Sequence, residues 1–299
     1  MVAAFDAICV GESMAQLTPH PAGPLSAGGP MWLDVAGAES NVAVHLARLG
    51  DRVAWASRVG ADPLGRLVRD RIAGYGVDMS LAETDPARPT GVYFKDPGGG
   101  TTTVHYYRAG SAAATLGPSL LAHPAFAACR LIHLSGITPA LSESCLALID
   151  RALAMPTTVS FDVNHRPALW PSVRRAAAVL AGLADRAGLV FVGLDEADRL
   201  WGTGTPAEVR ERLAGPAVLV VKDGARGATS FHPGGVTFVP AGPVEVVEPV
   251  GAGDAFAGGY LHGLLAGWAE PARLALGHRI AAAALRTGGD IGEDLGEDS

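Results

Sequence analysis

Residues 250–259 (VGAGDAFAGG) carry the most informative chemistry in the sequence. Their glycines let backbone N–H groups crowd around an anion at the start of a helix, where the helix dipole also favours negative charge. Phosphate is the natural ligand of such a loop. The carboxylate of Asp254 repels phosphate, but it fits a base that accepts the proton of an attacking hydroxyl. The pattern therefore predicts phosphoryl transfer to a hydroxyl group, with Asp254 as an ordinary helix cap being the alternative.

A second segment, residues 220–228 (VVKDGARGA), predicts a strand that enters a Gly-x-x-Gly turn and continues into a further strand. Such a turn can approach a nucleotide closely because glycine has no side chain. A tight hairpin turn explains Gly224 and Gly227 about equally well. This segment lies shortly before residues 250–259, which favours the interpretation that it binds a nucleotide.

Composition limits the classes of function. The chain has 299 residues, of which 48% are hydrophobic and 18% charged, enough to bury the core of one large domain or of one domain plus a subdomain. The formal net charge of −7 offers no attraction to nucleic acids or to anionic lipid surfaces. Only Lys95 and Lys222 among the 23 basic residues are lysines, a bias that suggests a GC-rich genome.

Several other classes of protein lack support. Cys9, Cys129 and Cys145 are widely separated in apolar runs, and we expect them to be reduced core residues. The start of the chain has neither a basic leader nor a long apolar span, so we expect a cytoplasmic protein. The histidines show no metal-ligand spacing, and no Gly-x-Ser-x-Gly elbow is present. Gly11-Glu12-Ser13 stands where a Rossmann dehydrogenase needs Gly-x-Gly-x-x-Gly.

Short apolar runs alternate with helical periodicity, which is typical of a parallel sheet covered by helices on both faces. We expect buried strands at residues 5–10, 53–57, 131–134, 158–162, 189–192 and 217–221, and helices at residues 39–49 and 63–73. Gly50 should end the first helix. Residues 31–35, 91–95 and 102–108 alternate like exposed antiparallel strands and predict a small β-lid, with residues 19–30 as a connection within it.

The chain resembles the PfkB (ribokinase-like) family of carbohydrate kinases over nearly its whole length. Residues 37–43 (GAESNVA) look like the first family signature, and residues 250–259 look like the second, in the right order and at the right separation. The resemblance implies one ribokinase-like α/β domain over residues 1–299, with a central, mostly parallel sheet flanked by helices on both faces. It also implies a small β-sheet lid from about residues 12–36 and 90–110. We expect a loose acidic tail at residues 290–299.

Within this family, residues 106–112 (YYRAGSA), 133–141 (HLSGITPAL) and 161–166 (FDVNHR) are similar to 2-keto-3-deoxygluconate kinases. An acidic sugar needs cationic partners, and arginine suits bidentate pairing with a carboxylate. We expect Arg108 to reach the sugar from the lid and Arg166 from the end of a core strand. The alternatives are that Arg166 contacts nucleotide phosphate, or that either arginine forms a surface ion pair.

The resemblance also assigns the site residues. Asp254 would be the general base, assisted by the amides of Gly251, Ala252 and Gly253. The sugar site would comprise Gly37, Ala38, Asn41, Tyr93, Tyr106, Arg108, Arg166, Asp254 and Asp290, although Tyr93 and Tyr106 also fit simple cross-strand packing. The nucleotide site would comprise Asn164, Arg166, Gly193, Lys222, Gly224, Ala225, Gly227, Gly251, Gly253 and His278. Glu196 would act on Mg²⁺ through water, unless it is a solvent-facing helix residue.

Three positions depart from the family pattern, namely Ala36, Gly193 and His278, and they concern nucleotide and Mg²⁺ handling. The resemblance implies ATP and Mg²⁺ as cofactors and leaves the need for a monovalent cation open. The expected reaction is phosphorylation of the 6-hydroxyl of 2-keto-3-deoxy-D-gluconate, with either C4 epimer as acceptor. The alternatives are a kinase of a neutral sugar or nucleoside, and a catalytically silent sensor. Apolar outer positions in the lid, Trp32, Val35 and Val92, favour a dimer.

Overall fold

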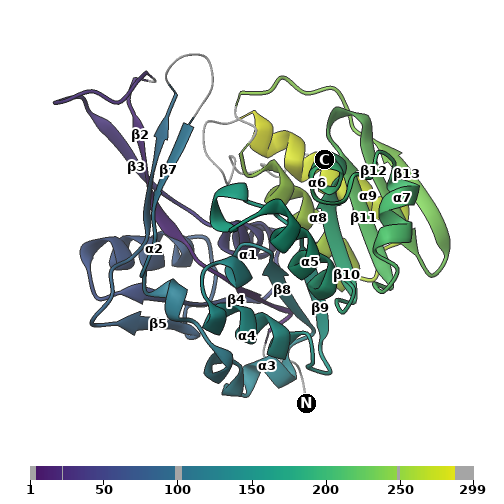
Figure 1. The fold of residues 1–299 in the computed structure, drawn as a ribbon, viewed down its shortest axis with the longest axis horizontal. Helices are drawn as coiled ribbons and strands as arrows, with labels where there is room; N and C mark the ends of the chain where they lie inside the picture. The colour runs from purple at the N-terminus through teal and green to yellow at the C-terminus, as the bar shows by residue number, and fades with distance from the viewer. Residues whose placement is uncertain (1–4, 22, 98–102, 248–249, 287–299) are drawn as a thin grey trace.

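The computed structural model describes residues 5–21, 23–97, 103–247 and 250–286. Nine strands form a central sheet in the order β13-β12-β11-β10-β9-β8-β1-β4-β5 (Figure 1). The strands from β11 to β5 run parallel, and β12 and β13 are added antiparallel at one edge. The bounds are β1 (Ala7–Val10), β4 (Val53–Gly60), β5 (Ala82–Asp85), β8 (Leu131–Ser135), β9 (Thr158–Asp162), β10 (Leu189–Gly193), β11 (Val218–Asp223), β12 (Gly227–His232) and β13 (Gly235–Pro240).

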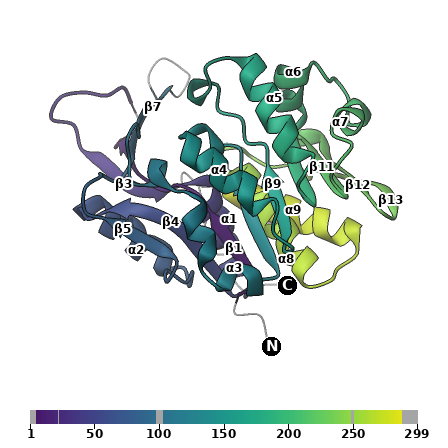
Figure 2. The ribbon, with the colours of Figure 1, turned by 60° about the horizontal axis from the view of Figure 1, so that its bottom comes forward.

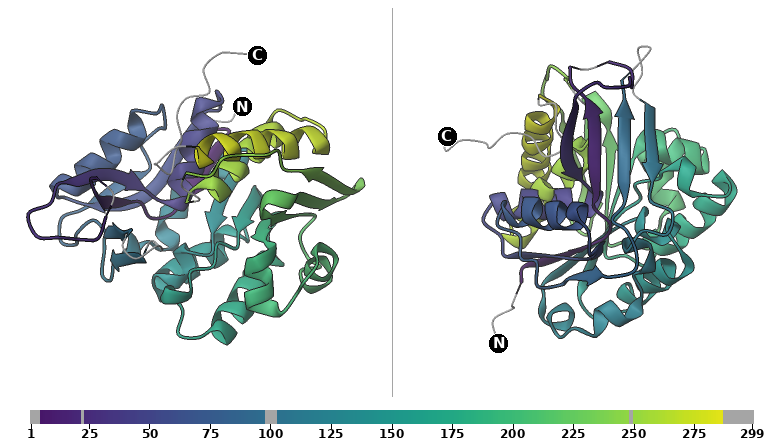
Figure 3. Two further views of the ribbon diagram at one scale, coloured as in Figure 1. Left: turned by 90° about the horizontal axis from the view of Figure 1, so that it is seen from above. Right: turned by 90° about the vertical axis from the view of Figure 1, so that its left-hand side faces the viewer.

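Helices cover both faces of this sheet, as the sequence predicts (Figures 2 and 3). Along β10, Leu189 and Phe191 enter one core while Val190 and Val192 enter the other, which explains why the parallel strands read as continuous apolar runs. The core of Leu189 also contains α1 (Ala38–Arg48), α2 (Pro63–Ala73), α8 (Ala252–Leu265) and α9 (Glu270–Leu285). The opposite core contains α3 (Ala125–Ala128), α4 (Glu143–Ala152), α5 (Val173–Ala184), α6 (Leu194–Trp201) and α7 (Pro206–Arg212).

Short 3₁₀ turns complete the connections at η2 (Ala113–Thr115), η3 (Pro118–Ala122), η4 (Thr138–Ala140), η5 (Pro167–Leu169) and η6 (Gly224–Arg226). Gly50 follows α1 with a φ of 94°, which confirms its place as the stop of that helix. The three cysteines are free and buried, as expected. None of the helices in the described part of the chain is long and apolar enough to span a membrane.

A separate four-stranded sheet forms the expected lid at the upper left of Figure 1. Its order is β3 (Met31–Ala36), β2 (Met14–Pro19), β6 (Val92–Asp96) and β7 (Thr103–Tyr107), and β2 pairs parallel with β6. Strand β2 is additional to the three lid strands that the alternation predicts. Trp32 is 60% exposed, but Val35 is buried, because residues next to α1 turn inward, so Val35 is wrong as an outer position. The acidic tail at residues 290–299 lies outside the described residues.

Candidate active site

A cavity of about 510 Å³ lies between the lid and the end of the central sheet where the parallel strands finish. The carboxyl ends of parallel strands share one edge of a sheet, so the residues that follow them converge there. Glu12 follows β1, Asn164 follows β9, and Glu196 follows β10. Fourteen of the residues predicted for the site line this cavity: Gly37, Ala38, Asn41, Tyr93, Tyr106, Arg108, Asn164, Arg166, Gly193, Glu196, Lys222, Gly251, Gly253 and Asp254.

Asp254 lies in the first turn of α8 and lines the cavity. The cap residue of that helix is Gly251, whose φ of 86° favours glycine, and no side chain caps the helix. The alternative of Asp254 as an ordinary cap is therefore wrong. Its carboxylate instead accepts a hydrogen bond from Asn41 Nδ2 at 2.9 Å and one from Asn164 Nδ2 at 3.5 Å.

Burial is the main cause that raises the pKa of Asp254 to about 7, and the nearby Asp162 carboxylate raises it further. The hydrogen bond from Asn41 and the charges of Arg166 and Lys222 act in the opposite direction. Asn164 has a φ of 39°, a left-handed conformation that asparagine tolerates better than most residues. A carboxyl group with a pKa near neutrality, held by two amides at a helix N-terminus, can serve as a base next to a bound anion.

A cluster of charges lies beside Asp254 at the ends of β9, β10 and β11. Lys222 Nζ donates to Asp162 Oδ2 at 2.8 Å, and the Asp162 side chain is buried. Glu196 accepts hydrogen bonds from the backbone N–H groups of Gly193, at 3.2 Å, and of His165. Burial and the neighbouring Asp162 raise the pKa of Glu196. The Glu196 carboxylate is thus bound to two backbone amides in the cavity wall, which disagrees with a solvent-facing residue.

The lid contributes a wall of aromatic side chains. Tyr93 on β6 and Tyr106 on β7 are cross-strand partners whose ring centroids are 5.6 Å apart. Both rings also line the cavity. The two tyrosines therefore pack against each other across the strands and also form part of the cavity wall. The Tyr93 hydroxyl donates to Gln16 of β2, which fixes the ring against the sheet. These rings provide an apolar surface with polar edges, suited to a polyol chain.

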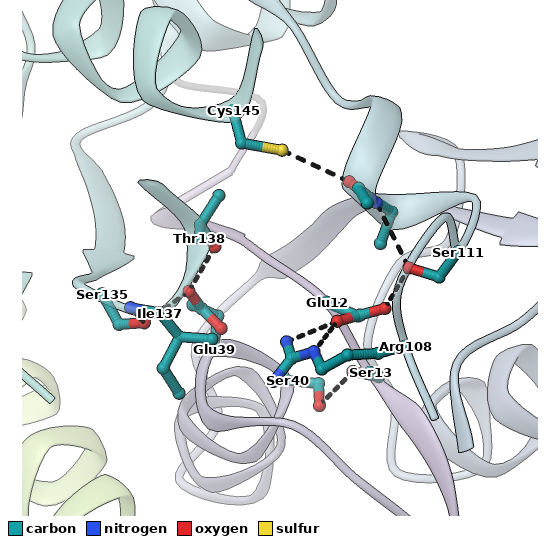
Figure 4. A network of polar contacts seen from close by, with 12 residues as sticks. Glu12, Ser13, Glu39, Ser40, Arg108, Ser111, Ser135, Ile137, Thr138 and Cys145 are labelled. Atoms are coloured by element: carbon teal, nitrogen blue, oxygen red, sulfur yellow. Dashed lines mark hydrogen bonds and ion pairs between the residues drawn. The ribbon is translucent and has the colours of Figure 1, made fainter. Parts of the chain in front are cut away.

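Arg108 follows β7 and forms a buried ion pair with Glu12 (Figure 4). Arg108 Nε donates to Glu12 Oε2 at 2.6 Å, and Arg108 Nη2 contacts the same oxygen. Ser111 Oγ donates to Glu12 Oε1 at 2.5 Å. The sequence does not predict Glu12 as a site residue, although its place directly after a buried parallel strand is a signal for one. The surface ion pair considered for Arg108 is replaced by a buried pair in the cavity wall.

The start of α1 is fixed by a second buried carboxylate. Glu39 Oε1 accepts hydrogen bonds from Ser135 Oγ at 2.7 Å and from Thr138 Oγ1 at 2.8 Å (Figure 4). Burial raises the pKa of Glu39. A Cβ atom at Gly37 would lie 2.4 Å from the carbonyl oxygen of Glu12, so the chain passes too close there for any side chain. These contacts hold Gly37 and Asn41 at the cavity.

Some predicted residues lie elsewhere. Ala252, Gly224, Ala225 and Gly227 do not line the cavity in the described part of the chain, and Asp290 lies outside the described residues. His278 is also absent from the cavity wall. Its Nε2 lies 3.1 Å from the carbonyl oxygen of Val239, and its ring packs on Phe256. Arg166 is exposed, and its Nη1 donates to the carbonyl oxygen of His165 at 3.4 Å.

Within the described residues, no group of three or more His, Cys, Asp and Glu side chains could hold a metal ion. Mg²⁺ prefers oxygen ligands and in phosphoryl transfer is bound mainly by phosphate and water, with one or two protein carboxylates. The carboxylates of Asp162, Glu196 and Asp254 do not form such a group, so a metal in this cavity would be held mainly by nucleotide phosphates and water. The site thus combines a buried carboxyl group with a raised pKa, the N-terminus of a helix, cationic side chains and an aromatic wall.

Comparisons with known proteins agree with this arrangement. The family model described as pfkB family carbohydrate kinase matches residues 4–295. The chain is 36% identical over 287 residues to the 2-dehydro-3-deoxygluconokinase of Thermoproteus tenax, covering 94% of this chain and 88% of that protein. It is 36% identical over 290 residues to the 2-dehydro-3-deoxygalactonokinase of Haloferax volcanii, covering 93% of this chain and 90% of that protein.

A solved structure, that of a PfkB protein from Polaromonas sp. JS666, superposes with a TM-score of 0.88 at 36% sequence identity. The match covers 95% of this chain and 96% of that one. The family match and the identities over nearly the whole chain confirm the resemblance that the two signatures indicate. The chain belongs to the pfkB family of carbohydrate kinases.

Proposed function

We propose that the protein transfers the γ-phosphoryl group of ATP to the 6-hydroxyl of 2-keto-3-deoxy-D-gluconate, also called 2-dehydro-3-deoxygluconate. The observation that carries the proposal is Asp254, held by Asn41 at the N-terminus of α8, in one cavity with the cationic lid residues. The names of the relatives at 36% identity support an acidic sugar as the acceptor.

In this mechanism the 6-hydroxyl oxygen attacks the γ-phosphorus in line, and its proton passes to the carboxylate of Asp254. The new O–P bond forms as the bond between the γ-phosphorus and the β–γ bridging oxygen breaks, which gives the 6-phosphate and ADP. The backbone N–H groups of Gly251, Gly253 and Asp254 stabilise the charge that develops on the phosphoryl oxygens. Asn41 and Asn164 orient the base.

Lys222 would contact the transferring phosphate from the sheet side, because its ammonium lies in the cavity beside the start of α8. Mg²⁺, when bound, would neutralise charge on the β- and γ-phosphate oxygens. Glu196 and Asp162 would act on that metal through water, since Glu196 is bound to backbone amides and Asp162 to Lys222. Arg166, exposed at the rim, would reach the nucleotide or the sugar carboxylate.

The activity should depend on pH in a way that follows from the pKa of Asp254. Because that pKa is raised to about 7, the carboxyl group is protonated and unable to act as a base at lower pH. We expect kcat/KM for the sugar to rise about tenfold per pH unit below pH 7 and to level off above it. Initial rates from pH 5 to 9, with ATP saturating, measure this limb, and a flat profile between pH 5 and 7 would contradict the assignment.

The proposal is tested by ADP release with Mg²⁺-ATP and a panel of acceptors: 2-keto-3-deoxygluconate, its galactonate epimer, gluconate, ribose, fructose and adenosine. We expect turnover of one or both keto-deoxy acids with kcat/KM at least a hundredfold above the neutral acceptors. Both epimers belong in the panel because relatives with either name share 36% identity with this chain. Preference for a neutral sugar would replace the substrate but keep the kinase, and no turnover at all would favour a sensor.

A further inference from the structure

Two glycines at the end of the segment 250–259 are not explained by anion binding. Gly258 and Gly259 are buried in α8, one turn beyond Asp254, and neither is among the described residues that line the cavity. Glycine inside a helix destabilises that helix relative to alanine. A pair of adjacent glycines at this point of α8 therefore needs another explanation.

Gly258 lies where α8 packs against α1. A Cβ atom on Gly258 would lie 2.6 Å from the Cβ atom of His45, a buried residue of α1. The Cβ atom of His45 is bonded to the backbone, so no rotation of its side chain moves it away. Because carbon atoms in contact lie about 3.5–4.0 Å apart, a methyl group at position 258 would separate the two helices by roughly 1 Å.

The same two helices carry the hydrogen bond that holds Asp254. Asn41 lies four residues before His45, and Asp254 lies four residues before Gly258, so the two contacts are one helical turn apart along the same pair of helices. Asn41 Nδ2 donates to Asp254 Oδ2 at 2.9 Å. A hydrogen bond between nitrogen and oxygen spans about 2.7–3.2 Å, so a separation of roughly 1 Å would break it.

Both helices are also held from behind. On the opposite side of α8, a Cβ atom on Gly259 would lie 2.9 Å from the carbonyl oxygen of Leu276, so the backbone of α9 leaves α8 no room to move back. Helix α1 is fixed through Glu39, which accepts hydrogen bonds from Ser135 and Thr138 (Figure 4). A side chain at position 258 could thus be accommodated only by disturbing the contact between α1 and α8.

We propose that Gly258 is a positioning residue for the general base, because the absence of a side chain there lets α8 approach α1 closely enough for Asn41 to bind Asp254. This inference rests on the proposed function, in which Asp254 accepts the proton of the acceptor hydroxyl. The hydrogen bond from Asn41 lowers the pKa of Asp254 against the effect of burial. Without that bond the carboxyl group stays protonated to a higher pH.

The low-pH limb of kcat/KM is a direct readout of this contact. The charged side chains that act on the pKa of Asp254 are Asp162, which raises it, and Arg166 and Lys222, which lower it, and none of the three lies on α1 or α8. Burial lowers the pKa of His45 to about 4, so His45 stays neutral above pH 5 and adds nothing to the limb. A shift of the limb in a variant at position 258 therefore reports on the bond from Asn41.

The test measures kcat/KM from pH 5 to 10 for the acceptor that the wild type converts best. We expect Gly258→Ala to move the midpoint of the low-pH limb upward by about one pH unit or more, since the carboxylate loses a hydrogen bond. The plateau of kcat should fall at least about tenfold, because the base is no longer oriented. Gly182→Ala is the matched control, since Gly182 is exposed within α5 and its Cβ atom would meet nothing within 4 Å. Its limb and its kcat should equal those of the wild type.

A double-mutant cycle shows whether Gly258 acts through Asn41. Asn41→Ala alone should move the limb upward by a similar amount, and adding Gly258→Ala to it should cause no further shift. Two shifts that add in full would mean that Gly258 affects Asp254 by another route, which would overturn the inference.

A swap variant, His45→Gly/Gly258→Ala, moves the missing Cβ atom from α8 to α1. The nearest remaining neighbour of the new methyl group is then the carbonyl oxygen of Val42 at 3.6 Å, an ordinary contact. We expect this variant to regain the wild-type midpoint of the limb. Thermal unfolding midpoints are measured for every variant, and the swap variant decides the question if Gly258→Ala alone does not fold.

The outcomes separate the inference from the proposed function. A wild-type limb near pH 7 that is unchanged in Gly258→Ala overturns the inference and leaves the proposed function in place. A swap variant whose limb stays shifted also overturns the inference, because close approach of the helices would then not be the cause. A wild type without a low-pH limb near pH 7 overturns Asp254 as the base and the inference with it.

Discussion

Asp254→Asn is expected to lower kcat by about 10²–10⁴-fold, with KM for ATP and for the sugar acid changed only a few-fold. Asparagine has nearly the same shape, and its oxygen can still accept the hydrogen bond that Asn41 Nδ2 donates at 2.9 Å. It cannot accept the proton of the attacking hydroxyl. The loss should therefore fall on the chemical step, which steady-state rates with both substrates varied will resolve.

Stability measurements separate this effect from misfolding. The pKa of Asp254 is raised from 3.8 to about 7, chiefly by burial, so the ionised carboxylate costs the folded state stability. That cost is absent below pH 3.8, grows as the pH rises to about 7, and is fully present above it. Asp254→Asn should thus be at least as stable as the wild type in urea at pH 8. A kcat within tenfold of the wild type would refute Asp254 as the base.

Arg108→Met is expected to destabilise the protein by about 3–5 kcal/mol. The substitution leaves the Glu12 carboxylate buried, with the hydrogen bond from Ser111 Oγ at 2.5 Å still in place but without its countercharge. An ionised carboxyl group without its countercharge is costly in a site of low dielectric constant. Urea unfolding at pH 7 measures the loss as a shift in midpoint, and the variant should also bind the sugar acid more weakly.

The double variant Glu12→Gln/Arg108→Met is the matched control. Glutamine keeps an oxygen for Ser111 Oγ and removes the buried charge, so we expect most of the lost stability to return. Affinity for the sugar acid should not return, because Arg108 is still missing. A loss below about 1 kcal/mol in Arg108→Met alone, which is the range of exposed pairs, would mean that the pair with Glu12 contributes no more than a surface ion pair.

The parallel core of the fold could be predicted from the sequence because its strands are buried on both faces. Runs such as residues 189–192 are apolar at every position, and the helices between them show clear periodicity. Strand β2 was harder to predict. Its residues 14–16 are all buried and residues 17–19 are only partly buried, so it lacks the alternation of buried and exposed residues by which the other lid strands were predicted. In Met31–Ala36 the burial also changes along the strand, from exposed Trp32 and Leu33 to buried Val35 and Ala36.

The two ends of the site differ in how far they could be predicted. Asp254 lies within the glycine-rich segment 250–259, so the residues that suggest its chemistry occur together in one short stretch of sequence. The partner of Arg108 is 96 residues away in the chain, and only the folded lid brings the two together. His278 is an example of a sequence position that misled. Its place in the family pattern suggested a contact with the nucleotide, but in the structure its ring nitrogen Nε2 lies 3.1 Å from the carbonyl oxygen of Val239 on β13.

The division of the cavity between two sheets affects how such an enzyme can acquire new substrates. Tyr93, Lys95, Tyr106 and Arg108 come from the lid or its edge, while Asp254 comes from α8 and Lys222 from β11 of the central sheet. Substitutions in the lid can thus change the lining of one side of the cavity without altering Asp254 or Lys222. Because the lid is a separate sheet, its inner face can be grafted onto a relative as one unit, and the acceptor preference of such a chimaera would show whether the lid sets it.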